Sequence, residues 1–183
     1  MHYSMHTSVI RAALRSNFRP PFACSKRCFS TTPSLHAKNR IWPARVRNES
    51  HLHSLILSSA STRVPLLTLW MTTWSRESDE VSPILRELIE KDGIGEDKGT
   101  VSFVEVETDS PDLGGISGMA QRYGINHIPT LLAFDRQEPQ IETKVSKLDH
   151  LKDKEFLIRW IETEAARHGS GGAGGRFFGL FGR

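Results

Sequence analysis

The feature that most constrains the fold is residues 65–85, PLLTLWMTTWSRESDEVSPIL, where a short apolar run meets a polar corner and an amphipathic segment. Residues 64–71 are apolar apart from Thr68, which is typical of a central strand covered on both faces. The segment after the corner has the apolar spacing of one helix face. The positions on that face are Val81, Ile84, Leu85, Leu88 and Ile89. A buried strand that leads through a corner into a helix predicts an α/β unit.

The ends of this helix carry their own signals. Glu77, Asp79 and Glu80 crowd its first turn, where the helix dipole favours negative charge. Gly93 is expected to cap its C-terminus. Pro83 lies inside the helix, lacks a backbone donor and should bend it.

The rest of the pattern predicts an α/β domain over residues 48–168 with a mixed central sheet. Asn48 is expected to cap a helix that turns Leu52, Leu55 and Ile56 inward. Leu85 and Ile128 are expected in the core. Further strands are expected over residues 45–48, 101–106, 130–134 and 142–148, and further helices over residues 48–58, 110–123 and 153–166. The helix over residues 110–123 should be weak or partly irregular because it contains Gly114, Gly115 and Gly118.

The N-terminal segment is basic, although the net charge of the whole chain is only +3. Residues 1–48 contain nine Lys or Arg residues and no acid. Mitochondrial presequences are Arg-rich, Ser-rich and acid-poor, so residues 1–36 are predicted to be one, which places the mature protein in the mitochondrial matrix. Residues 37–47 would follow as an extended basic arm. Cleavage after Phe29 or after His36 is expected; a disordered basic arm that stays attached is the alternative.

The cysteines, Cys24 and Cys28, both precede the expected cleavage sites. A mature protein without cysteine excludes disulfides, thiolate catalysis and Cys-ligated zinc. His51 and His53 are two residues apart and would diverge on a helix, so no metal site is predicted. No cofactor is expected either.

Three further expectations concern partners. The basic segment lies at the N-terminus, which indicates a targeting signal rather than a nucleic-acid-binding site. No apolar run approaches the ~20 residues of a membrane-spanning helix. Residues 169–183 are rich in Gly and Phe; we expect a flexible tail, with a short anchor for a partner as the alternative.

Two motifs carry a resemblance to the thioredoxin-like superfamily. Trp74, with Pro83 nine residues later, resembles the active-site corner and helix of thioredoxin, and residues 123–130, YGINHIPT, resemble its cis-proline loop. The resemblance implies a thioredoxin fold, a three-layer α/β/α domain with a mixed sheet. It also implies a cis peptide bond between Ile128 and Pro129.

The chain departs from the family where redox chemistry takes place. Ser75 and Ser78 occupy both cysteine positions, so the corner is degenerate and we expect no catalytic residue there. Leu69 and Glu105 stand where the family keeps its proton-handling aspartate and lysine. A serine nucleophile at Ser75 would need a base such as His127, and no Gly-x-Ser-x-Gly elbow is present.

The resemblance favours a protein-binding or scaffold role. In the family, the loop before the proline offers backbone groups to an extended chain, and the tryptophan is an apolar platform. Trp74, His127, Ile128 and Pro129 would form that peptide-binding face here, for a partner that the sequence does not identify. A thiol–disulfide oxidoreductase or a glutathione-using relative is the alternative. A structural subunit of a larger assembly is a third hypothesis.

Overall fold

The structure is a computed structural model that describes residues 38–114 and 118–169. Its strands form one five-stranded sheet in the order β1-β3-β2-β4-β5, with β1, β3 and β2 parallel and with β4 antiparallel to both β2 and β5. The strands are β1 (Arg40–Ile41), β2 (Leu66–Met71), β3 (Ser102–Glu107), β4 (Thr130–Asp135) and β5 (Glu138–Pro139). The predicted presequence and all but the first residue of the predicted tail lie outside the described residues.

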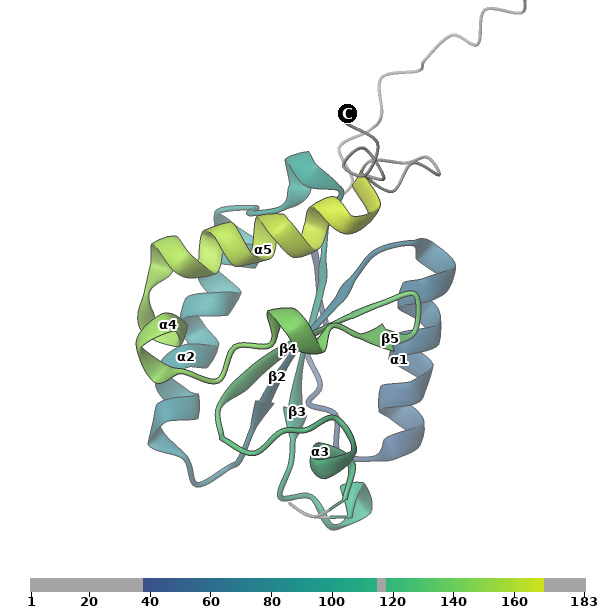
Figure 1. Ribbon diagram of the computed structural model, residues 1–183, viewed down its shortest axis with the longest axis vertical. Coiled ribbons are helices and arrows are strands. Elements are labelled where there is room, and N and C mark those ends of the chain that lie inside the picture. The colour runs from purple at the N-terminus through teal and green to yellow at the C-terminus, as the bar shows by residue number, and fades with distance from the viewer. Residues whose placement is uncertain (1–37, 115–117, 170–183) are drawn as a thin grey trace, which may run out of the picture. The chain divides into compact units, whose positions relative to one another are not determined.

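Helices cover both faces of this sheet (Figure 1). They are α1 (Glu49–Thr62), α2 (Arg76–Arg86), α3 (Met119–Arg122), α4 (Leu148–Lys152) and α5 (Lys154–Gly169). Helices α2, α4 and α5 pack on one face, and α1 and α3 pack on the other. The predicted three-layer α/β/α architecture is therefore confirmed. No helix in the part of the chain that the structure describes is long and apolar enough to cross a membrane.

Each face of the sheet has its own hydrophobic core, and strand β2 contributes to both. All six of its residues are buried, as the apolar run predicts. Successive side chains of a strand point to opposite faces, so Leu67 and Leu69 join the core under α2 and α5, whereas Leu66 and Trp70 join the core under α1. The hydroxyl of Thr68 donates to the Leu132 carbonyl (2.7 Å) and accepts from the Trp70 indole (2.8 Å), which satisfies the polar side chain of this strand.

The predicted helix caps are present. The Asn48 side chain accepts a hydrogen bond from the His51 amide at 2.7 Å and starts α1, which runs past residue 58 to Thr62. Helix α2 continues as a π-helical turn, Glu87–Lys91. Gly93 follows that turn with a φ of +63°, a left-handed conformation that glycine adopts without a steric penalty.

The predicted strand over residues 142–148 is wrong, and the predicted helix over residues 110–123 is irregular, as its glycines indicate. In place of a strand over residues 142–148, the chain forms a 3₁₀ turn at Ile141–Thr143, makes a single bridge from Val145 to Leu131, and enters α4. The Thr143 carbonyl accepts from the Trp160 indole (2.7 Å), so it is taken up by a side chain of α5 instead of a strand ladder. The helix predicted over residues 110–123 is interrupted at Gly114, whose φ of +76° is left-handed, and only α3 follows.

The segment expected as a basic arm contributes the edge of the sheet. Arg40 and Trp42 donate backbone hydrogen bonds to the carbonyls of Val101 and Phe103 (both 2.9 Å). The edge strand predicted over residues 45–48 is reduced to a single bridge between Val46 and Val106. Strand β1 therefore lies earlier in the chain than the sequence pattern indicates, because Val46 is the one apolar residue of that stretch.

Candidate functional site

The corner around Trp74 and the loop before β4 lie at the same end of the sheet. Strand β2 leads into the corner and pairs antiparallel with β4, so that Trp70 faces Thr130 across the ladder. The loop of residues 123–129 enters β4 immediately before that pair, and its Ile128–Pro129 peptide bond is cis. The sheet register therefore brings together two segments that are about fifty residues apart in the sequence.

Trp74 presents its ring to solvent, and 72% of its surface is exposed. Across the described residues the other exposed large apolar side chains are Leu57 (43%) and Ile141 (47%). The backbone beside the ring is fixed, since the Thr73 hydroxyl and amide donate to the Asp109 carboxylate at 2.7 and 3.3 Å. Slight burial raises the pKa of Asp109, but these hydrogen bonds outweigh it and the pKa is lowered.

Ser75 is the N-cap of α2 and is almost fully buried. Its hydroxyl accepts from the Ser78 amide at 3.3 Å and donates to the Glu77 carboxylate at 3.1 Å. The pKa of Glu77 is lowered by its own backbone amide and by Ser75, which makes Glu77 a weak base. Within residues 38–114 and 118–169 no hydrogen bond joins Ser75 to His127. The hydroxyl of Ser75 therefore serves as a helix cap rather than as an activated nucleophile.

Ser78 lies one turn into α2 and is fully buried. Its hydroxyl has no hydrogen-bond partner in the described ranges. A buried hydroxyl without a partner costs free energy, so packing rather than hydrogen bonding holds this side chain. Ser75 and Ser78 are therefore both buried residues.

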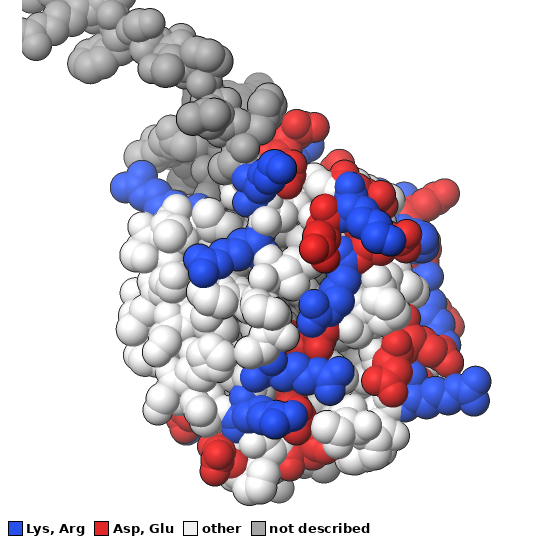
Figure 2. Space-filling view, turned by 180° about the vertical axis from the view of Figure 1, so that it is seen from behind, with Lys and Arg blue, Asp and Glu red and all other residues white. Residues whose placement is uncertain are grey.

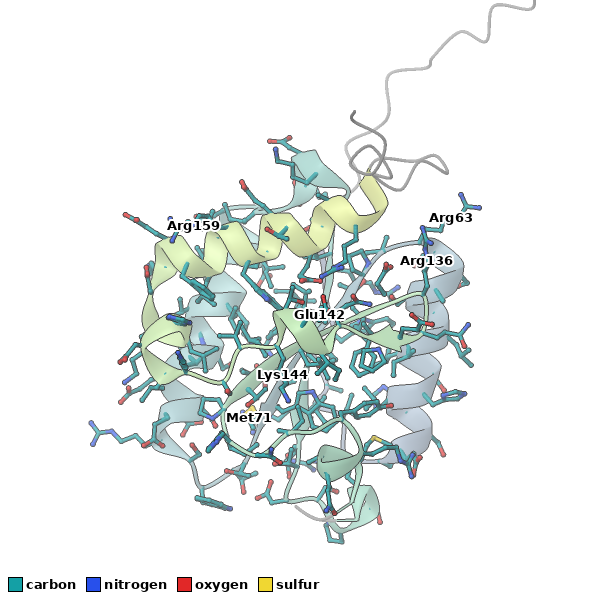
Figure 3. All side chains as sticks on the ribbon, in the orientation of Figure 1. Arg63, Met71, Arg136, Glu142, Lys144 and Arg159 are labelled. Carbon is teal, nitrogen blue, oxygen red and sulfur yellow. The ribbon has the colours of Figure 1, made fainter. Side chains whose placement is uncertain are left out.

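The loop before β4 is held at both ends. The Thr130 hydroxyl donates to the His127 carbonyl at 2.6 Å, and the Lys144 ammonium, which is labelled in Figure 3, donates to the Gly124 carbonyl. His127 is exposed and Ile128 is half-buried. Pro129 is buried, so it offers little surface to a ligand.

Ile128, like Asn126, has backbone polar groups that are free of partners among the described residues. Its backbone N–H and C=O make no hydrogen bond within the part of the chain that the structure describes. Backbone groups normally find partners in a folded protein. The corner and the loop thus combine an exposed aromatic ring with an unused backbone donor and acceptor, which is what an extended peptide needs for strand-like pairing.

A buried ion-pair network lies at Glu105, in the middle of β3, and sequence reasoning did not find it. The Glu105 side chain is only 2% exposed. One of its carboxylate oxygens accepts from the Ser82 hydroxyl (2.6 Å) and from Arg86 (2.8 Å), and the other accepts from Arg45 (2.9 Å). Burial raises the pKa of Glu105, but the hydrogen bonds from Ser82, Arg45 and Arg86 outweigh it and leave the pKa lowered. The network ties α2 and the segment before α1 to β3.

The residues beneath the corner are an apolar leucine and this ion-paired carboxylate. Glu105 pairs across the sheet with Leu69, which is fully buried and apolar. A carboxylate held ionised by two guanidinium groups cannot readily exchange a proton. No cluster of three His, Cys, Asp or Glu residues that could bind a metal occurs across residues 38–114 and 118–169.

Comparison with known proteins identifies the fold. No family model matches the sequence, and no curated protein does so either. Among solved structures, thioredoxin O1 from Arabidopsis thaliana in its oxidized state is 20% identical, with a TM-score of 0.50 over 68% of this chain and 97% of that one. Thioredoxin from Fasciola hepatica is 16% identical, with a TM-score of 0.50 over 68% of this chain and 98% of that one. Schistosoma mansoni thioredoxin is 18% identical, again with a TM-score of 0.50, over 68% and 94%.

Each of these proteins is covered almost completely. Identities of this size establish the fold and leave the activity open. The chain has the thioredoxin fold.

Proposed function

We propose that this protein is a thioredoxin-fold binding module that takes up an extended peptide without redox chemistry. The face consists of Trp74, His127 and Ile128, with Pro129 beneath them. The observation that carries the proposal is the exposed Trp74 ring at the same end of the sheet as the unused N–H and C=O of Ile128. A bound peptide would pair with Ile128 as an added strand and place an apolar side chain against the ring.

The residue types at the corner support binding without turnover. Ser75 and Ser78 stand where a thioredoxin carries its two cysteines, and a hydroxyl cannot enter a disulfide. Of the groups beneath the corner, Leu69 is apolar and Glu105 is held in ion pairs. A peptide at this face would therefore be held and released unchanged.

The cellular location is part of the proposal. Residues 1–36 have the composition of a mitochondrial presequence, which supports import into the matrix. The partner would then be a protein of that compartment, and it would expose an extended segment.

The test is affinity purification of the tagged full chain from isolated mitochondria, beside the W74A/H127A double variant. Because both side chains are exposed, the double variant should fold normally, which thermal unfolding will verify. A protein retained by the wild type and lost with W74A/H127A supports the proposal. A peptide from that protein should then shift the Ile128 amide resonance in an NMR titration.

A matched control is L57A, which removes an exposed apolar side chain from α1. This variant should capture the same protein as the wild type. The proposal is refuted if W74A/H127A captures every partner that the wild type does, or if L57A loses the partner equally. In the second case the loss would reflect general surface hydrophobicity.

A further inference from the structure

A pocket lies between α1 and the sheet edge, at the opposite end of the strands from Trp74. It has a volume of about 170 Å³. Its lining includes Val64 and Leu66 at the start of β2 and Ser102 at the start of β3. The C-terminal end of β2, which leads to the Trp74 corner, is five residues further on, roughly 17 Å at the usual rise of a strand. The two sites are therefore separate.

Three alternating residues of the edge segment line this pocket: Lys38, Arg40 and Trp42. Side chains two apart on a strand share a face, and here that face lies toward α1. Asn39, between the first two, holds the backbone in place: its side chain donates to the carbonyls of Ile89 (3.1 Å) and Ile94 (2.8 Å) and accepts from the Val101 amide (3.0 Å).

The two cations of the pocket are unpaired. Neither Lys38 nor Arg40 forms an ion pair with any described residue. The Arg40 guanidinium carbon lies 3.7 Å from the centre of the Trp42 ring. Stacking uses the face of a guanidinium group and leaves the N–H donors at its edge available to an anion.

Hydroxyl groups in the pocket are also unused. Thr100 is only 3% exposed, yet its side chain makes no hydrogen bond to any residue that the structure describes. The hydroxyls of Ser58 and Ser102, which also line the pocket, are likewise free within the described ranges. The Thr100 hydroxyl oxygen, unlike those of Thr72 and Ser78, is not fully buried, so water or a ligand can reach it.

None of the described residues that line the pocket is acidic. The Glu96 carboxylate reaches this segment but accepts the Asn39 amide and does not line the pocket. Helix α1 has a single charged residue, Glu49, at its far end, and Figure 2 shows a broad uncharged area bordered by basic and acidic side chains. The Ser59 carbonyl at the C-terminal end of α1 is occupied by the amides of Arg63 and Val64.

We propose that this pocket binds a small phosphate monoester with a short apolar body. Such a group carries about two negative charges at neutral pH, which match Lys38 and Arg40. The free hydroxyls, Thr100 among them, would hydrogen-bond its oxygens. Leu55 and Val64 would contact the apolar part. The volume is below the roughly 300 Å³ of pockets for drug-sized ligands, so the ligand is a small metabolite rather than a dinucleotide.

The test is an NMR titration of the full chain with phenyl phosphate at constant ionic strength. Saturable shifts at the amides of Arg40, Trp42 and Ser102 are expected. Inorganic phosphate should bind at least about tenfold more weakly because it lacks the apolar body, and benzyl alcohol should not bind because it lacks the charge. The absence of saturable shifts with phenyl phosphate would overturn the proposal.

The variants K38Q/R40Q and T100V should each weaken phenyl phosphate binding, the first by about tenfold or more. T100V keeps the side-chain shape, so it tests the hydroxyl even if the double variant is unstable. R63Q is the matched control, because Arg63 at the end of α1 points away from the domain (Figure 3) and does not line the pocket. W74A should also leave binding unchanged. Equal affinity in K38Q/R40Q, T100V and R63Q would refute the site.

Discussion

At the residue scale, the domain depends on how the buried carboxylate of Glu105 is neutralised. Two arginines and Ser82 supply its hydrogen bonds. The network joins three parts of the chain that are distant in sequence, and it stands where the resemblance to thioredoxin implies a lysine. The arginines at positions 45 and 86 neutralise the charge of Glu105.

We predict that E105Q lowers the free energy of unfolding at pH 7 by about 2–3 kcal/mol. Removing one partner of a buried pair costs more, about 3–5 kcal/mol, but Arg45 and Arg86 remain about a third exposed and can be hydrated. Urea unfolding measures the change. E107Q is the matched control on the same strand: its partner Arg47 is largely exposed, so the cost should stay below about 1 kcal/mol. An equal loss of unfolding free energy in E105Q and E107Q would contradict the stabilising role given to the buried Glu105 network.

Wild type and E105Q also test how the stability of the domain depends on pH. The pKa of Glu105 is lowered in the folded state, so its contribution is complete above the unfolded pKa of about 4.3 and is lost as the pH falls through the folded value. The stability difference between wild type and E105Q should therefore be constant between pH 7 and about pH 5 and shrink below that. A difference that persists unchanged at pH 3 would show that folding does not lower the pKa of Glu105.

At the element scale, α2 links the candidate site to the core. Its N-cap is Ser75 at the corner, and its apolar face packs against β2 and β3. The apolar spacing predicted this face correctly, with Leu85 fully buried and Ile84 partly so. Ile128 was expected to be equally buried, but it is half-buried at the edge of the second core. The difference arises because the loop that carries Ile128 lies at the end of the sheet, outside its covered area.

We predict that L85A lowers the free energy of unfolding by about 2–5 kcal/mol, the usual cost of a cavity in a packed core. I128A should cost about half as much, because part of its side chain is already in water. Chemical denaturation measures both changes in unfolding free energy, with m-values that should equal that of the wild type. If I128A proves as costly as L85A, the loop is more deeply packed than the structure has it.

At the whole-molecule scale, the chemistry depends on which part of the chain is retained. Both cysteines lie in residues 1–36, outside the described residues. A processed chain would be free of thiols, whereas an unprocessed one could act as an oxidoreductase. The binding hypothesis therefore expects a mature N-terminus after Cys28, whereas the redox hypothesis expects a chain that keeps both cysteines.

We predict that intact mass spectrometry of the protein from mitochondria finds a chain without Cys24 and Cys28. That chain should not reduce insulin disulfides, because it contains no thiol. The double variant S75C/S78C provides the positive control for the assay, since it restores a thiol pair at the corner. A retained N-terminus, together with insulin reduction that C24S/C28S abolishes, would favour the oxidoreductase hypothesis.

The sequence by itself determined the elements whose signals are local. The apolar run before Trp74, the helical spacing after it and the cap at Asn48 each depend on neighbouring residues, and all three are confirmed. Local signals misled after Ile141, where a 3₁₀ turn replaces the expected strand, whereas the break at Gly114 follows from the glycines of that segment.

Only the tertiary structure decided which distant side chains meet. Glu105 and Arg45 are 60 residues apart in the chain, and Thr100 is a similar distance from Lys38. The order of strands in the sheet places each pair together, and strand order is a property of the whole fold. The periodicity of one segment fixes which face a side chain occupies, but not which segment packs against that face, and so the ion-pair network and the basic pocket emerge only from the assembled domain.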